Sequence, residues 1–446
     1  MLLDFMISNY KSFAEEAMLS LEAAPKQSGL DYSLHKRKIG RKTYKTLCSA
    51  VLYGPNAAGK TAIIGALDTL KHIVTRGNVR DSDPLTSVDK AAFALSLIPN
   101  SMLANPLPVK FGIRFFEHDD LYDYALHIDL GAFLDSKHDR KVVFERLSIN
   151  EREIFARNEQ EVSLGDLDIF KDVLSLSFVK NEAAARLFAS EVLADELFLT
   201  NGFKSLVSPT LSSCVTSWFE HRLTVVYRAD QVKTARWVKD AAPQSAYIEK
   251  TVNDAAKIFG ISSNALGYML SEGESEPQLC SLFRSPAGKG GQAVNAEDYE
   301  SYGTVRFVNL FPLVVQAIAT GGVLVVDEFD ASIHPMALMS IINVFHNDDI
   351  NKLGAQLVFN THNPVFLNKN VFRRDEIKFV ERDHETGVST CYSLSDFGTS
   401  GPAGVRKGDD YMKSYFVSRY GAIEDIDFTP LFEEIISDES SGPDEE

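Results

Sequence analysis

The chain has 446 residues, of which 45% are hydrophobic, so two or three domains with a large core can form and wholesale disorder is excluded. Lys and Arg number 45 and Asp and Glu 62; the net charge of −17 argues against broad attraction to nucleic acids or membrane surfaces, although it permits a local basic patch. The four cysteines lie far apart without a C-x-x-C pair, which indicates reduced thiols in the cytoplasm and no zinc site or disulfide framework. The chain starts without a basic region or a long apolar run, so we expect no signal peptide and no membrane-spanning helix.

The N-terminal region is predicted to contain two short strands within residues 2–22, where Leu3, Phe5 and Ile7 alternate along the chain. Residues 35–45 then hold six basic side chains in eleven positions. Such a cluster can neutralise phosphates in a DNA-contact loop, but a solvated loop, or one beside the nucleotide, is the favoured interpretation.

A strand-like apolar segment at 47–53 leads into a glycine-rich loop, and a helix-like segment at 62–76 follows. The loop fits the phosphate-binding pattern G-x-x-x-x-G-K-[ST], and its flanks favour this motif over a glycine turn with a chance lysine. Its glycines let backbone N–H groups point at phosphate oxygens, the lysine reaches the β- and γ-phosphates of ATP, and the threonine binds Mg²⁺. The ATP-binding residues are therefore predicted to be Gly54, Pro55, Asn56, Ala57, Ala58, Gly59, Lys60 and Thr61.

Strand-like runs at 109–116, 122–128 and 142–149 predict an antiparallel sheet beside the nucleotide-binding sheet, so residues 1–149 are assigned to an N-terminal ATPase half. Residues 150–298 are predicted to form a mostly helical insertion, because 170–179, 182–198 and 211–226 show helical spacing. Within it, the basic segment 227–239 is interpreted as a solvated helix. The alternative is a surface that faces a partner or nucleic acid. Residues 271–296, rich in Gly, Ser, Pro and Glu, are predicted to be a mobile connection.

The C-terminal ATPase half is assigned to residues 299–437, and 438–446 are predicted to be an acidic disordered tail. Four apolar residues, 323–326, precede Asp327 and Glu328, and a buried strand delivers such side chains beside the phosphates. Asp327 is predicted to hold Mg²⁺ directly or through water, and Glu328 to polarise the attacking water. An Asp-Glu pair after an apolar strand can arise by chance and is weak evidence alone. Together with the phosphate-binding loop, it indicates an ATPase.

A second apolar strand, 356–360, is followed by His362. This histidine is predicted to contact the γ-phosphate or the attacking water as a catalytic group. The alternative is a polar cluster at the N-terminus of the next helix, which Asn363 and Pro364 would start.

Ser301, Gly303 and Thr304 precede an apolar helical run at 307–318. A helix N-terminus with these residues forms an anion site, and the inferred strand order keeps it from the phosphates of its own chain. We therefore expect this helix N-terminus to contact the γ-phosphate of ATP that is bound to a second copy of the chain. ATP would then hold two copies together as a homodimer. The alternative is an ordinary N-cap.

The order of these motifs resembles that of an ABC-class ATPase head of the SMC, Rad50 and RecF kind, and more closely the stand-alone ATPases of bacterial phage-defence and abortive-infection operons of the AbiL, PARIS and RloA/RloB type. The fold it implies is an α/β P-loop NTPase with a mixed sheet, an antiparallel β subdomain and a mostly helical insertion. The stretches that carry the resemblance are 5–13, 52–61, 122–126, 144–147, 300–304, 326–335, 373–377 and 419–422.

The resemblance implies that residues 331–334 form the D-loop that crosses the dimer interface. It also implies a role in antiviral defence, in which the ATPase restrains or releases a separate effector encoded nearby, often a Toprim-like nuclease. The chain departs from the pattern because no Leu precedes Ser301 and no Gln lies between Thr61 and Glu159, where a Q-loop glutamine is expected. The alternative function is a RecF/SMC-like DNA clamp; a transporter motor is disfavoured by the signature.

Overall fold

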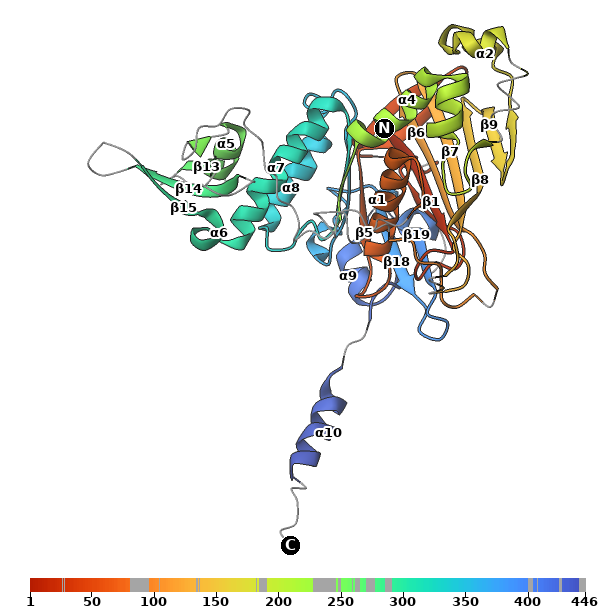
Figure 1. Cartoon of the computed structure of the whole chain (residues 1–446). Coiled ribbons are helices and arrows are strands. Elements are labelled where there is room, and N and C mark those ends of the chain that lie inside the picture. Colours follow the sequence, from red (N-terminus) through yellow and green to blue (C-terminus); the bar gives the residue numbers. More distant parts are fainter. Residues whose placement is uncertain are drawn as a thin grey trace.

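A computed structural model places the chain around two neighbouring β-sheets with helices between and beside them (Figure 1). Most of the basic segment 227–239 and the middle of the predicted helix 182–198 lie outside the residues that the structure describes. It describes residues 1–446 except 26, 28, 81–95, 104, 134, 136, 182, 184–190, 228–245, 248–249, 259, 261–264, 270–276, 285–290, 400–403, 407, 425–426 and 441–446.

A six-stranded sheet carries the phosphate-binding loop. Its strands are parallel except for β19 at one edge, and the central ones consist of buried residues, as in sheets covered on both faces. The predicted α/β nucleotide-binding fold is therefore confirmed. In spatial order the strands are β11 (Leu223–Val226), β16 (Val323–Val326), β17 (Gln356–Asn360), β5 (Ser49–Tyr53), β18 (Ile377–Arg382) and β19 (Ser389–Ser393).

The predicted antiparallel sheet is present and larger than expected, because the first strands of the chain join it. Its strands alternate buried and half-buried residues, which is the pattern of a sheet with one face on a core. In spatial order they are β10 (Glu161–Leu164), β9 (Arg152–Asn158), β8 (Lys141–Ile149), β7 (Asp120–Asp129), β6 (Val109–Glu117), β1 (Leu2–Ser8) and β2 (Ala17–Ser20).

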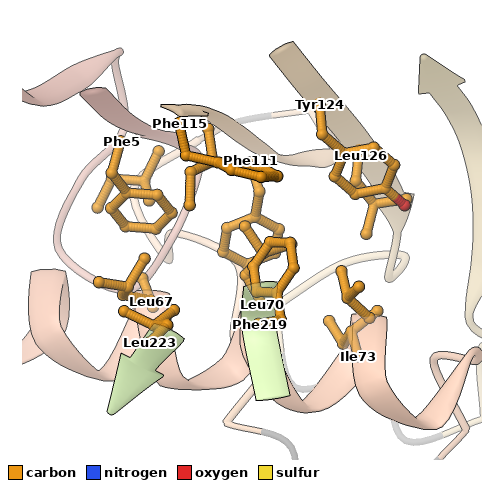
Figure 2. Packing of buried hydrophobic residues seen from close by; sticks show 14 of the residues in the cluster. Phe5, Leu67, Leu70, Ile73, Phe111, Phe115, Tyr124, Leu126, Phe219 and Leu223 are labelled. Atoms are coloured by element: carbon orange, nitrogen blue, oxygen red, sulfur yellow. The ribbon is translucent and has the colours of Figure 1, made fainter. Parts of the chain in front are cut away.

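Helix α1 (Lys60–Arg76), which follows the phosphate-binding loop, packs on the antiparallel sheet. Figure 2 shows Leu67, Leu70 and Ile73 of α1 opposite Phe5 and Phe111. Burying a leucine or phenylalanine side chain stabilises a fold by about 1.5–3 kcal/mol. This core therefore fixes the direction in which α1 presents its N-terminus.

The Gln356 side chain joins the two sheets. Its carbonyl accepts the Leu2 N–H at 2.6 Å, and its amide donates to the carbonyls of Leu2 and Leu47, each at 2.9 Å. Because the residue is fully buried, these hydrogen bonds satisfy backbone groups that water cannot reach.

The basic segment 35–45 is a β-hairpin and not the loop that we predicted. It consists of β3 (Leu34–Ile39) and β4 (Lys42–Leu47), joined by a turn at Gly40. Lys36 pairs directly with Lys45, and both are exposed. The hairpin therefore gathers like charges on one face.

Residues 150–298 contain helices, as predicted, but share the range with strands of three sheets. The predicted helix 211–226 ends in β11, because its Val-rich end adds to the parallel sheet. Parts of the predicted mobile connection 271–296 are strands of a four-stranded antiparallel sheet. The elements after β10 and before β16, apart from β11, are η2 (Asp168–Val173), α2 (Leu176–Lys180), the π-helical η4 (Leu199–Val207), α4 (Pro209–Ser217), the π-helical η5 (Trp218–Arg222), β12 (Ala246–Tyr247), α5 (Lys250–Ile258), β13 (Ala265–Met269), β14 (Gln278–Arg284), β15 (Gly291–Asn295), α6 (Ala296–Tyr299) and α7 (Tyr302–Thr320).

Helix α7 is, within the described residues, the one helix whose length and composition would allow it to span a membrane. More than half of it is buried in the domain, and its buried face carries the polar side chains of Arg306 and Asn309. These observations identify α7 as a core helix.

The remaining elements follow the ATPase strands. The predicted tail begins inside a helix, since residues 438–440 belong to α10, and 441–446 lie outside the described residues. The elements are η1 (Asp31–Ser33), α8 (Pro335–Phe345), η7 (Pro364–Phe366), η8 (Leu394–Phe397), α9 (Tyr411–Phe416) and α10 (Thr429–Ser440).

Candidate nucleotide-binding site

The loop between β5 and α1 has a backbone that only glycine allows at two positions. A Cβ atom at Gly54 would lie 2.1 Å from the Val380 carbonyl oxygen. Gly59 has φ +112°, and a Cβ there would lie 3.0 Å from the Ser12 hydroxyl. Both glycines are therefore required for the close approach of the loop to its surroundings, as expected for a phosphate cradle.

The Lys60 side chain lies folded back on this loop. Its ammonium donates to the carbonyls of Gly54 at 2.7 Å and Pro55 at 2.8 Å. Burial lowers the pKa of Lys60 to about 8, and the nearby carboxylates of Asp327 and Glu328 oppose that shift. The lysine is thus held at the mouth of the loop by neutral acceptors, which an anionic phosphate would outcompete.

Asp327 lies at the C-terminal end of β16, beside the first turn of α1. The Thr61 hydroxyl donates to its Oδ1 at 3.0 Å, and the Asn360 amide donates to the same oxygen at 2.6 Å. Hydroxyl and carboxylate oxygens are ligands that Mg²⁺ prefers, so the pair predicted as the metal site has the right chemistry and proximity. The described residues contain no group of three or more His, Cys, Asp or Glu that could hold a metal without help from a ligand.

Glu328 follows in a left-handed backbone conformation, with φ 48°. Two side chains hold its peptide groups: the Asn360 carbonyl accepts the Glu328 N–H, and the Arg306 guanidinium of α7 donates to the Glu328 carbonyl. Such a conformation costs a non-glycine residue about 1–2 kcal/mol, so these contacts offset a strained turn. Sequence reasoning missed both residues. A polar residue at the end of a buried strand was the available signal for Asn360; a lone arginine in an apolar helix was the signal for Arg306.

A cavity of about 460 Å³ brings the predicted groups together. Its volume is in the range of small-molecule ligand pockets, about 300–1,000 Å³. Glu328 and His362 lie on the same cavity as the phosphate-binding loop. The described lining residues are Lys11, Ser12, Asn56, Ala57, Ala58, Gly59, Lys60, Thr61, Ala62, Ile98, Pro99, Asn100, Ser101, Phe133, Glu328, Asn360, His362, Arg382 and Gly387.

His362 faces this cavity, whereas Asn363 caps the following η7 by accepting the Val365 N–H at 3.0 Å. Burial, and next the charge of Lys60, lower the pKa of His362, so the imidazole is neutral near pH 7. The capping role that we weighed for this cluster falls to Asn363, while the catalytic role of His362 stays a prediction.

Asn100 lies on the cavity wall, in the part of the chain where a Q-loop glutamine was expected. Its side-chain amide donates to the Lys11 carbonyl at 2.7 Å, and its N–H donates to Asn9 Oδ1 at 2.9 Å. Both polar atoms of the Asn100 side chain are thus bonded to backbone groups, since its carbonyl also accepts the Met102 N–H at 2.8 Å.

Ser301, Gly303 and Thr304 lie outside this cavity as described. Ser301 is the N-cap of α7 and accepts the Thr304 N–H at 3.2 Å. A Cβ at Gly303 would lie 2.0 Å from the Ser332 carbonyl oxygen, so the start of α7 packs tightly on residues 331–334. The N-cap is therefore observed, and contact with the phosphates of a second copy stays a prediction.

These features define the class of the protein: a glycine-rich loop between a strand of a parallel sheet and a helix is the phosphate-binding loop of a P-loop NTPase. Residues 49–207 and 246–368 match the family AAA_21, described as "AAA domain, putative AbiEii toxin, Type IV TA system". The match spans most of the chain, which therefore belongs to this family, and membership of a P-loop ATPase family implies ATPase activity.

Two further comparisons add less. No curated protein matches the chain. Among solved structures, the SMC head domain from Thermotoga maritima is similar at 12% sequence identity and a TM-score of 0.37, with 88% of this chain and 98% of that chain covered. The finer resemblance to AbiL, PARIS or RloA/RloB type subunits stays a prediction.

Proposed function

We propose that this protein is an ATP-driven switch that binds ATP with Mg²⁺, dimerises around the nucleotide, hydrolyses it and thereby controls a separate effector. The observation that carries the proposal is the single cavity that joins Lys60, Thr61, Glu328 and His362. These residues, which we propose as phosphate ligand, metal ligand and acid–base groups, line this cavity at the carboxyl ends of parallel strands.

Thr61 and Asp327 would hold Mg²⁺, since their oxygens already lie 3.0 Å apart. When bound, Mg²⁺ neutralises charge on the β- and γ-phosphates. Lys60 would exchange its two carbonyl acceptors for phosphate oxygens, which is a charge-assisted contact. Glu328 would accept the proton of the attacking water, and the neutral imidazole of His362 would orient that water or contact the γ-phosphate.

The surface around the start of α7 supports the proposed dimer, which is the second half of this mechanism. Ser301, Gly303 and Thr304 lie away from the cavity of their own chain, and large side chains beside them, Tyr302 and Met336, are 56% and 69% exposed. A second copy placed over this face would cover them and would bring the N-terminus of α7 to the γ-phosphate. Loss of that phosphate on hydrolysis would loosen the pair.

The family description and the resemblance support a proposal for the cellular setting. We propose a cytoplasmic role in antiviral defence by abortive infection, with an effector such as a Toprim-like nuclease encoded nearby. The homodimer formed around ATP would restrain or release that effector, and hydrolysis would reset the switch.

The test separates chemistry from dimerisation. Glu328→Gln is expected to bind ATP and to hydrolyse it at least about a hundredfold more slowly, because one acid–base group is lost. In this background, light scattering with ATP should show a dimer. Ser301→Arg should abolish the dimer, Ser301→Thr should keep it as the matched control, and Lys60→Ala should bind no nucleotide. Normal ATP turnover by Glu328→Gln would refute the proposed hydrolysis mechanism. An ATP-dependent dimer of Ser301→Arg would refute the proposed dimer.

A DNA clamp is the second candidate function, and the hairpin β3–β4 favours it. Lys36 and Lys45 are directly opposed across the strands with Lys38 two residues on, and cross-strand like charges are unfavourable unless an anion lies between them. A clamp requires duplex DNA to be retained at moderate salt with a steep salt dependence, which filter binding at two salt concentrations measures. Equal retention by Lys36→Gln/Lys45→Gln would exclude this hairpin.

A further inference from the structure

Helix α10 stands apart from the two sheets and from α9 in Figure 1. Its first turn is capped locally, since the Asp427 carboxylate accepts the Thr429 N–H at 2.8 Å. Large apolar side chains recur at helical spacing from the residue before the helix into its third turn, and each is between 46% and 64% exposed. These residues, called the α10 stripe below, are Phe428, Leu431, Phe432, Ile435 and Ile436.

A short helix of this kind gains little from its own hydrogen bonds. Isolated helices shorter than about 12–15 residues are marginal in water, and most helical stability in proteins comes from packing of an apolar face. Spacing of i, i+3, i+4, i+7 and i+8 is also the pattern of helices that insert into a groove. The α10 stripe therefore has the form of a surface that another body covers.

The charge around the stripe restricts what that body is. Residues 420–446 contain ten acidic side chains and no Lys or Arg. Glu433 and Glu434 lie in the helix itself, off the stripe. Pairing of two α10 helices from two copies would bring like charges together, which opposes association.

Two surfaces of the described chain that could receive the stripe fit it poorly. The groove of about 290 Å³ beside α9 is lined by apolar residues such as Val365 and Met412 and by one lysine, Lys369, but its two carboxylates, Asp409 and Asp410, outnumber that lysine and disfavour an acidic helix. The basic hairpin β3–β4 has suitable charge, yet none of its large apolar side chains is exposed, so it could not cover the stripe.

We propose that α10 docks into a groove of a separate protein, apolar at its floor and lined by Lys or Arg at its rim. Resting on the proposed function, this groove belongs to the effector that the ATPase controls. The α10 stripe provides the apolar anchors, and Glu433 and Glu434 pair with the basic rim.

The test uses the full-length chain and, as probe, the purified product of the neighbouring open reading frame, with binding measured by titration calorimetry. The variant Phe432→Asp/Ile435→Asp is expected to weaken binding by about a hundredfold or more, whereas the matched Phe432→Leu/Ile435→Leu stays within about threefold. Glu433→Gln/Glu434→Gln should weaken binding about tenfold at low salt, a difference that high salt removes. All variants should keep the unfolding temperature of the parent, because α10 stands away from the body.

Several outcomes would overturn the proposal. One is that the parent chain does not bind the probe, and another is that the Phe432→Asp/Ile435→Asp variant binds it as tightly as the parent. A third is that the chain alone forms a dimer which this variant cannot form, because a second copy would then cover the stripe. The switch fails separately: if α10-dependent binding is present but ATP changes neither binding nor effector activity, the docking site stands and the proposed control does not.

Discussion

Replacing Asn360 by alanine tests how the site positions the carboxylate of Glu328, which we propose to be catalytic. The Asn360 side chain bridges two groups: its amide donates to Asp327 at 2.6 Å, and its carbonyl accepts the Glu328 N–H. Asn360 is buried, so water cannot replace these contacts in full. Without them, Glu328 is free to leave its left-handed conformation, which would swing its carboxylate away from the cavity.

The magnitude follows from the two hydrogen bonds. The bond to a charged acceptor contributes about 1.5–3 kcal/mol and the bond between neutral groups about 1 kcal/mol. Together the two hydrogen bonds come to about 2.5–4 kcal/mol. A loss near 3 kcal/mol, within that range, corresponds to about a hundredfold in rate.

We therefore expect Asn360→Ala to lower kcat for ATP hydrolysis about a hundredfold while the Kd for ATP stays within about threefold, because Lys60 and the loop are untouched. Steady-state phosphate release and equilibrium binding of a fluorescent ATP analogue measure the two quantities. Asn363→Ala is the matched control, since this asparagine caps η7 and should leave kcat within about twofold. Equal kcat for Asn360→Ala and the parent would refute the positioning role.

Two further predictions concern buried charge. ATP binding at pH 8.5 should take up about 0.8 proton, because the pKa of Lys60 is about 8 in the free protein and phosphate raises it. Binding is therefore expected to be strongest below pH 8 and to weaken above it. Calorimetry in buffers of different ionisation enthalpy measures this uptake, and none in the parent would contradict it. Glu145→Ala should lower the free energy of unfolding by about 3 kcal/mol, since Tyr124 and the N–H groups of Phe198 and Leu199 lose their acceptor. Urea unfolding measures this loss, and a change below about 1 kcal/mol would contradict it.

Local patterns predicted much of the ATPase core. The loop at 54–61 needs only its own glycines and flanking elements, and the strand before Asp327 is a continuous apolar run, so both are visible in the sequence. The segment 211–226 was predicted wrongly at its C-terminal end, because the helical spacing of apolar residues continues into β11. Only pairing with β16 makes residues 223–226 a strand. Residues 35–45 were predicted to be a loop for a similar reason, since only the pairing of β3 with β4 makes this segment a hairpin.

The amino-acid sequence by itself determined which groups are available to bind a nucleotide and its Mg²⁺. They are a glycine-rich loop, a lysine, a threonine and two acidic residues after a buried strand. Tertiary structure decided how the acids are held. Asn360 and Arg306 come from β17 and α7, far along the chain from one another, and only the packing of those elements brings both to the Glu328 peptide. Hydrogen bonds depend on distances between atoms, and folding sets those distances for residues that spacing along the chain does not relate.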